Sequence, residues 1–193
     1  MKISDVAGEY FRLFGSAIIS PRRVGEVDGI VTQIFAHQAR YEAVEATSGV
    51  PWYVVALIHN LECSLKFNQH LHNGDALNRK TYNDPAGRPP GWDGTGTWEE
   101  SALDALRYDR LTQYTDWDIA RICYTFELYN GWGYRGKSIH SPYLWAGCQH
   151  YTAGKYIRDH VYDASAVSEQ LGSAVILKRM TERHLIALRA VDV

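Results

Sequence analysis

The segment 51–75, PWYVVALIHNLECSLKFNQHLHNGD, joins an apolar run to a polar one. Residues 52–58 (WYVVALI) have no polar face, which is typical of a helix buried on all sides. Pro51 stands where proline favours the first turn of a helix. The run ends in His-Asn and Glu62, before a loop dense in His, Asn and Asp. Either the helix turns toward water there, or it sets the Glu62 carboxylate at the lip of an apolar pocket.

Amphipathic helices are predicted on both sides of this segment. Apolar side chains recur in residues 22–50 with a period near 3.6, which predicts one long helix that ends near Gly49. Residues 165–191 are also periodic and predict a final packing helix. Between the helices, residues 67–96 are rich in Gly, Pro, Asn and Asp, and a loop of that length is usually functional. We therefore expect a mainly α fold of the α+β type, with helices around a buried central helix and a small hairpin or loop lobe, at about 67–97, forming one wall of a cleft.

Two further helix starts carry capping signals. Thr97 is followed three residues later by Glu100, which predicts a capping box. Thr115 and Asp118 have the same spacing and predict a second one, for a helix that ends at a Gly131 cap.

Length, charge and cysteine content limit the classes of protein to consider. The 193 residues suit one domain, 1–193, and a net charge of −2 without a basic stripe argues against nucleic acid as a partner. Three widely spaced cysteines indicate neither a disulfide framework nor a zinc ribbon. No apolar run is long enough for a membrane anchor or signal peptide. We expect a monomer without metal or cofactor, synthesised in the cytoplasm, that acts elsewhere after release or export.

Glu62 is the first candidate catalytic residue. In a helix its side chain shares a face with Val55 and Ile58, and apolar neighbours disfavour the charged form of a carboxyl and raise its pKa. A carboxyl that stays protonated near neutral pH is what a general acid for glycosidic cleavage requires.

Asp75 is the candidate second carboxylate, 13 residues after Glu62 in the polar loop. In a polar environment it would stay ionised and could activate water or stabilise an oxocarbenium-like transition state. The hydroxyl of Thr81 could orient the attacking water. Glu127 remains an alternative second carboxylate, whereas Glu99 is expected in the first turn of a helix, where the dipole favours it.

Several motifs together resemble those of phage-type and bacterial lysozymes, described as endolysins or peptidoglycan hydrolases. The order Glu62, Asp75, Thr81 resembles the Glu, Asp, Thr triad of that superfamily, and YNGWGYR is similar to a segment of lytic transglycosylases in which a Tyr lies near the catalytic Glu. The resemblance covers about residues 24–180 and rests on the strings IHNLE, HLHNGD, PAGRP, TWEESALDAL, YNGWGYR and SPYLW.

The resemblance implies a lysozyme-like fold and cleavage of the sugar strand of peptidoglycan. The catalytic residues would be Glu62, Asp75 and Thr81. His59 would orient Glu62, and the other residues expected to contact the glycan are His72, Asn73, Tyr129, Asn130, Trp132 and Tyr134.

Other interpretations of the same residues stay open. His59, His70 and His72 could be metal ligands, although their spacing matches no zinc motif. Cys63 could be a nucleophile, but it would point away from Glu62. The chain could also be a lytic transglycosylase, a chitinase or chitosanase, or a glycan-binding module without activity. The distance between the two carboxylates would separate inverting from retaining hydrolysis.

Overall fold

The computed structural model describes residues 1–129, 131–158 and 160–188. The chain divides into two compact units, one made of residues 1–32 and 118–193 and the other of residues 33–117. Helices dominate the described residues, which also contain a two-stranded antiparallel sheet. The mainly α class with a small β element is thus confirmed, while the lysozyme-like arrangement and the single domain stay predictions. Among the described residues, no helix is both long and apolar enough to cross a membrane.

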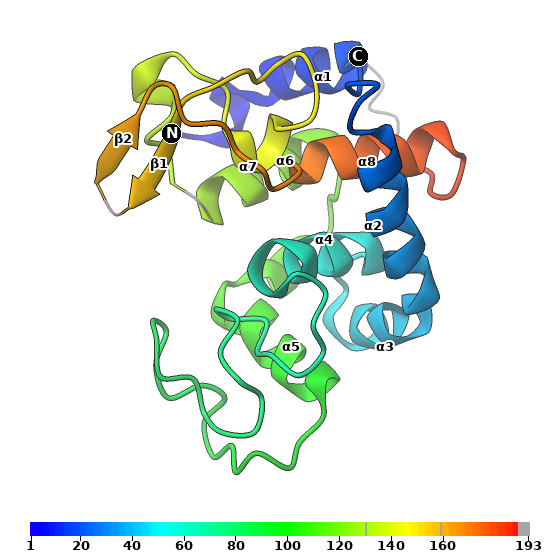
Figure 1. Cartoon of the computed structure of the whole chain (residues 1–193). Coiled ribbons are helices and arrows are strands. Elements are labelled where there is room, and N and C mark those ends of the chain that lie inside the picture. Colours follow the sequence, from blue (N-terminus) through cyan, green and yellow to red (C-terminus); the bar gives the residue numbers. More distant parts are fainter. Residues whose placement is uncertain (130, 159, 189–193) are drawn as a thin grey trace. The chain divides into compact units, whose positions relative to one another are not determined.

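The first unit is a set of helices with one hairpin (Figure 1). Its elements are η1 (Ile3–Asp5), α1 (Ala7–Ser16), the start of α2 (Val24–Ala36), α6 (Ile119–Tyr129), η3 (Arg135–Lys137), α7 (Pro142–Trp145), β1 (Lys155–Arg158), β2 (Val161–Asp163) and α8 (Ser173–Glu182). Helix α1 packs on α6, α6 on α7, and α7 on α8. The strands β1 and β2 pair antiparallel, with Tyr156 opposite Tyr162.

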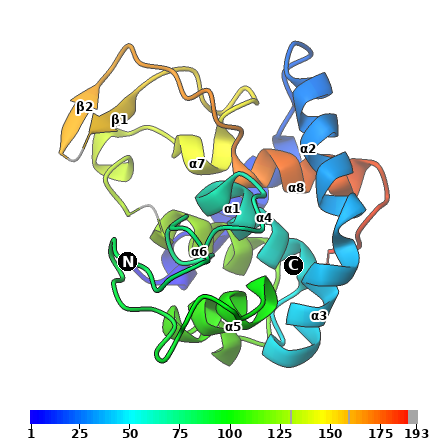
Figure 2. The ribbon, with the colours of Figure 1, turned by 60° about the horizontal axis from the view of Figure 1, so that its bottom comes forward.

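The second unit contains the segment 51–75, with its apolar run and the polar run that follows. After the end of α2 it contains α3 (Gln38–Ser48), α4 (Trp52–Cys63), α5 (Trp98–Tyr108) and η2 (Leu111–Gln113). Helix α3 packs against both α4 and α5, and Figure 2 shows α3 and α5 side by side. The segment 64–97, between α4 and α5, contains no helix and no strand, apart from an isolated bridge between Gln69 and Ala76.

Helix α4 is buried as its apolar sequence predicts. Every residue in 54–60 is buried, including His59 and Asn60. The helix ends where Ser64 and Leu65 adopt left-handed backbone conformations, with φ of 48° and 60°. This turn directs the chain out of the helix and into the segment 64–97.

The single long helix predicted for residues 22–50 is wrong, because two helices replace it. At His37 the backbone (φ −120°, ψ 16°) leaves the helical region, and its N–H donates to the carbonyl of Ile34, three residues back. The apolar period continues across this break, so it could not reveal it. The predicted end is confirmed, because Gly49 caps α3 with a φ of 74°.

The final helix is shorter than predicted. Helix α8 starts only at Ser173, and Val167, which lies within the periodic residues 165–191, is 58% exposed. Gly172 explains the late start, because its N–H donates to the Ala146 carbonyl (2.8 Å) and a β-carbon there would lie 2.2 Å from the Leu144 oxygen. The chain before α8 is therefore bound to the end of α7. Residues 189–191 of the predicted helix lie outside the described residues.

One of the two predicted capping boxes is present. Thr97 and Glu100 exchange both hydrogen bonds at the start of α5. The second prediction is wrong, because α6 begins at Ile119 and its cap is Asp118, whose carboxylate accepts the N–H of Arg121 (2.7 Å). Thr115 lies before that cap and is exposed.

Candidate functional site

Glu62 lies in the last turn of α4 with its side chain half-buried. Burial raises the pKa of its carboxyl from 4.5 to about 7, and repulsion by the Asp109 carboxylate acts in the same direction. A carboxyl with this pKa is protonated in about half of the molecules at neutral pH. The structure thus agrees with the raised pKa that the apolar neighbours of Glu62 predict.

A tight turn, residues 70–75, contacts the end of α4. The His70 N–H donates to the Asp75 carbonyl (2.7 Å), and the His70 carbonyl accepts the N–H of Gly74 (2.9 Å). Gly74 has a φ of 76°, and a β-carbon at this position would lie 2.8 Å from the carbonyl oxygen of Glu62. Only glycine fits both the conformation and the contact. The turn that carries Asp75 therefore adjoins the main chain of Glu62.

The Asp75 carboxylate is buried and accepts three hydrogen bonds. Its Oδ2 accepts the backbone N–H groups of Tyr82 (2.8 Å) and Asn83 (2.9 Å), and Oδ1 accepts the Asn83 amide (2.7 Å). Burial acts to raise the pKa of Asp75, but these hydrogen bonds outweigh it and lower the pKa. Asn73 supports the same turn, because its Oδ1 accepts the Asp75 N–H (3.0 Å) and its amide donates to the Asn83 carbonyl (3.1 Å). Asp75 is ionised, and both it and Asn73 organise the loop.

The Thr81 hydroxyl closes a loop. It donates to the Pro85 carbonyl (2.5 Å) and accepts the N–H of Arg88 (2.8 Å). The backbone N–H of Thr81 also donates to the Arg88 carbonyl (2.8 Å), and the residue is buried. These contacts give Thr81 a structural role, and its predicted role in orienting a water stays a prediction.

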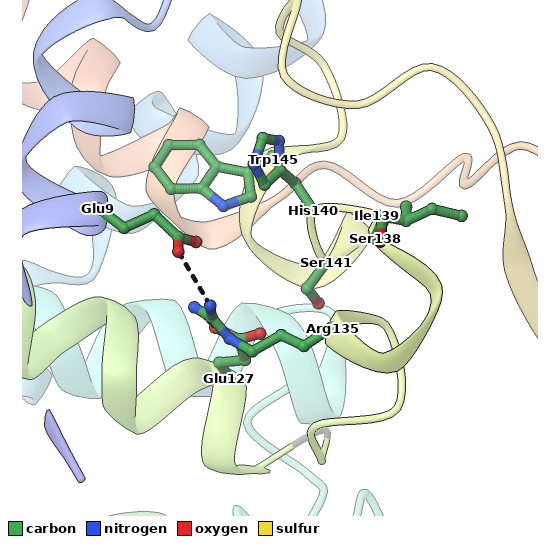
Figure 3. Close-up of a pocket in the computed structure, with 8 residues that line it drawn as sticks. All are labelled: Glu9, Glu127, Arg135, Ser138, Ile139, His140, Ser141 and Trp145. Carbon is green, nitrogen blue, oxygen red and sulfur yellow. Dashed lines mark hydrogen bonds and ion pairs between the residues drawn. The ribbon is translucent and has the colours of Figure 1, made fainter. Parts of the chain in front are cut away.

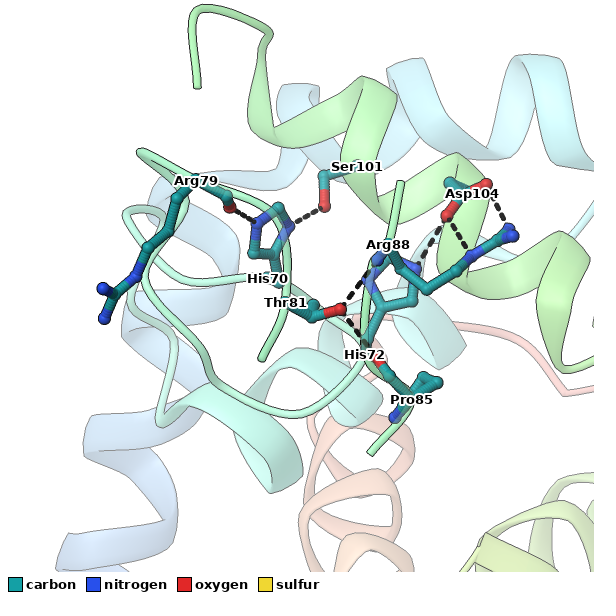
Figure 4. Close-up of polar contacts among 8 residues, drawn as sticks. All are labelled: His70, His72, Arg79, Thr81, Pro85, Arg88, Ser101 and Asp104. Carbon is teal, nitrogen blue, oxygen red and sulfur yellow. Dashed lines mark hydrogen bonds and ion pairs between the residues drawn. The ribbon is translucent and has the colours of Figure 1, made fainter. Parts of the chain in front are cut away.

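Two histidines fix the segment 64–97 to α5 (Figure 4). The Nδ1 of His70 contacts the Ser101 hydroxyl (2.6 Å), and its Nε2 donates to the Arg79 carbonyl (2.6 Å). The Nε2 of His72 contacts the Asp104 carboxylate (2.9 Å), and burial lowers the pKa of His72 despite that carboxylate.

Arg88 contacts the same Asp104 carboxylate through two nitrogens, at 3.0 and 2.5 Å. Sequence reasoning assigned no role to Asp104, Ser101 or Arg88. Ser101 and Asp104 are three residues apart on α5 and so share a helix face, but nothing in the sequence identifies their loop partners.

His59 and Cys63 belong to the interior of the second unit. His59 is fully buried, its Nδ1 contacts the Tyr41 hydroxyl (3.0 Å), and burial lowers its pKa to about 4. Its ring packs against Phe67 and Trp98. Burial raises the pKa of the Cys63 thiol to about 12, and the thiol donates to a backbone carbonyl. A neutral buried histidine and an un-ionised thiol are typical of packing residues, not of a nucleophile and its base.

Four of the residues predicted to contact the glycan come from one segment of the first unit. They are Tyr129, Asn130, Trp132 and Tyr134. Asn130 lies outside the described residues, and Trp132 is half-buried with its ring 5.2 Å from that of Tyr124. Tyr134 is buried, and its hydroxyl accepts the N–H of Tyr156 (3.1 Å). Tyr134 thus packs within its unit, and the predicted sugar contacts stay predictions.

The other two candidate carboxylates are paired with arginines. Glu99 contacts Arg40 through both oxygens (2.5 and 3.1 Å), and this pairing outweighs burial and lowers the pKa of Glu99. Glu127 is buried in the first unit and accepts a hydrogen bond from Arg135 (2.8 Å). The pKa of Glu62 is thus raised, whereas the pKa values of Asp75 and Glu99 are lowered.

Comparison with known proteins adds no identification. No protein-family model, no curated protein and no solved structure matches this chain. Among the described residues, no group of three or more His, Cys, Asp and Glu side chains is arranged to hold a metal ion.

The contact between Gly74 and Glu62 can be tested by substitution. We expect Gly74→Ala to lower the free energy of unfolding by about 1 to 3 kcal/mol more than Gly87→Ala, because the added methyl group collides with the Glu62 carbonyl. Gly87 is the matched control, since it lies in the same lobe with a φ of 78° and has open space around it. Urea denaturation of both variants measures the difference, and equal losses would show that the turn does not press on α4.

Proposed function

We propose that this chain is a glycoside hydrolase that cleaves the glycan strand of bacterial peptidoglycan, with Glu62 as the general acid. The observation that carries the proposal is a pair of opposite pKa shifts within one unit. Burial raises the pKa of Glu62 to about 7, whereas hydrogen bonds lower that of Asp75. Environments that separate two carboxyl pKa values in this way favour an acid role for one and an anionic role for the other.

The two groups would divide the reaction between them. Protonated Glu62 donates its proton to the glycosidic oxygen as the bond to the leaving sugar breaks. Positive charge then develops on the remaining sugar, and the ionised Asp75 stabilises it from a position fixed by three hydrogen bonds. A water molecule then adds its hydroxyl to the charged sugar carbon, and its remaining proton restores the protonated form of Glu62. The Gly74 contact supports this division, because it joins the turn that carries Asp75 to the main chain of Glu62.

The choice of peptidoglycan rests on the resemblance of the sequence motifs to lysozymes and endolysins. IHNLE contains Glu62, and HLHNGD contains Asp75. The residues on which the chemistry depends therefore lie within the motifs that carry the resemblance.

A second candidate is lytic transglycosylation, and the contacts of Asp75 favour it. Both Asp75 oxygens already accept hydrogen bonds, which leaves this carboxylate less able to activate water. Transglycosylation typically works with one carboxyl group, and Glu62 would supply it. Mass spectrometry of the products separates the two reactions, since hydrolysis adds one water for each bond cleaved and transglycosylation adds none.

Replacing the general acid should abolish activity. We expect Glu62→Gln to clear a suspension of bacterial cell walls at least about 100-fold more slowly, because glutamine has no proton to donate to the leaving oxygen. In the unchanged protein kcat/KM should fall as pH rises above about 7, since only protonated Glu62 is active. Glu42→Gln, at an exposed position on α3, is the control and should keep full activity. Full activity of Glu62→Gln would refute the assignment.

The pH dependence of stability tests the raised pKa independently of activity. The folded pKa of Glu62 lies above its ordinary 4.5, so the folded state binds the proton more tightly and stability falls as pH rises from about 4.5 to 7. The loss should reach roughly 3 kcal/mol and stay constant above pH 7. Glu62→Gln removes it, so this variant should be more stable than the unchanged protein at pH 8 and similar at pH 4. Denaturant unfolding at both pH values measures this, and an equal effect of Glu62→Gln at both would contradict it.

The identity of the second carboxylate can be decided by comparing three variants. We expect Asp75→Asn to lower kcat by about 100-fold or more, because the charge that stabilises the transition state is lost. Asn83→Ala removes one donor to Asp75 but keeps its charge, so a similar loss in both variants would mean that Asp75 acts only by holding the loop. If Glu127→Gln inactivates the protein and Asp75→Asn does not, Glu127 is the second carboxylate. Circular dichroism spectra confirm that each variant folds.

A further inference from the structure

The first unit contains a polar cavity of about 220 Å³. Glu9 reaches it from α1 and Glu127 from α6, while Arg135, Ser141 and Trp145 come from the segment 135–145 (Figure 3). Pockets for drug-sized ligands usually measure about 300–1,000 Å³, so this cavity suits one small chemical group.

The charges around the cavity do not balance. Arg135 donates to Oε2 of Glu9 (3.1 Å) and to Oε2 of Glu127 (2.8 Å), and the Tyr10 hydroxyl donates to the same Glu127 oxygen (2.5 Å). In the contacts of the described residues, Oε1 of neither carboxylate has a partner. Two carboxylates beside one guanidinium leave a formal charge of −1.

Ser141 supplies an independent sign of a ligand. It lines the cavity and is only 2% exposed, yet its hydroxyl has no hydrogen-bond partner among the described residues. Buried hydroxyl groups are normally paired, because an unpaired one loses its hydrogen bonds to water without replacement. A group bound in the cavity would restore them.

We propose that this cavity binds a small organic cation through a primary ammonium group held by Glu9, Glu127 and Ser141. An ammonium group has three N–H donors, one for each of these acceptors, and its single positive charge balances the cavity. The indole of Trp145 in the wall adds attraction for a cation. An anion would be repelled by both carboxylates, and a neutral alcohol would leave their charge uncompensated.

This inference goes beyond the proposed function. The cavity residues belong to residues 1–32 and 118–193, whereas Glu62 and Asp75 belong to residues 33–117. Ligand binding can be measured without a glycan substrate, so Glu62→Gln should keep it even while cleavage is lost.

The test is a titration of the full chain with n-butylammonium chloride, followed through the amide NMR signals of residues 135–145. We expect saturable changes in these chemical shifts. Neither 1-butanol nor sodium chloride at the same concentration should produce them. Glu9→Gln should weaken binding about tenfold, because one charge-assisted hydrogen bond is lost. Glu26→Gln, at a surface ion pair of α2 in the same unit, is the matched control and should bind normally.

Ser141→Ala is a second variant, chosen because it should weaken binding without affecting folding. Its hydroxyl has no partner to lose, so the variant should be as stable as the unchanged protein and yet bind butylammonium about fivefold more weakly. Titrations with D-glucosamine and with Nα-acetyl-L-lysine methylamide then show whether the ammonium group is carried by a sugar or by an amino-acid side chain.

Three results would overturn the proposal. They are the absence of saturable shifts with n-butylammonium, shifts of the same size with 1-butanol, and the same affinity of Glu9→Gln and Glu26→Gln for n-butylammonium. Any of them would mean that the cavity does not bind an ammonium group through its carboxylates.

Discussion

The burial of α4 on every side is the constraint on which the second unit depends. A helix without a polar face has to be enclosed, and residues 54–60 are all buried. Even His59 conforms, because burial lowers its pKa to about 4 and its Nδ1 contacts Tyr41. The helix reaches a half-buried carboxyl only at Glu62, in its last turn. The enclosure that stabilises α4 thus also disfavours the ionised form of Glu62 and gives it the pKa of an acid catalyst.

The segment 64–97 is held by polar contacts in place of regular secondary structure. Asp75 binds two backbone N–H groups, Thr81 closes the loop to Arg88, and Asp104 of α5 binds both His72 and Arg88. Backbone polar groups that are buried in a loop need hydrogen-bond partners, and these side-chain contacts supply some of them. Side-chain contacts therefore hold the turn beside α4, in place of regular pairing between strands.

The carboxyl groups of the two units differ in how their charge is compensated. Glu127 is buried but accepts hydrogen bonds from the Arg135 guanidinium and the Tyr10 hydroxyl. Glu62 meets the Asp109 carboxylate, which disfavours ionisation. Burial alone does not define the role of a carboxyl, because burial always disfavours its ionised form and neighbouring charges and hydrogen bonds either add to that effect or oppose it.

Local features of this fold were determined by the sequence itself. The apolar run of α4, the Thr97 capping box and the Gly49 helix end depend on residues a few positions apart, so periodicity and spacing predicted them. The same reasoning missed the break at His37 and chose Thr115 over Asp118, because two possible conformations satisfied one local pattern. Only the tertiary structure decided the partners of Asp75, the pairing of Asp104 with Arg88, and the cavity at Arg135. These contacts join residues seven or more positions apart across irregular segments, where no helical or strand period relates them.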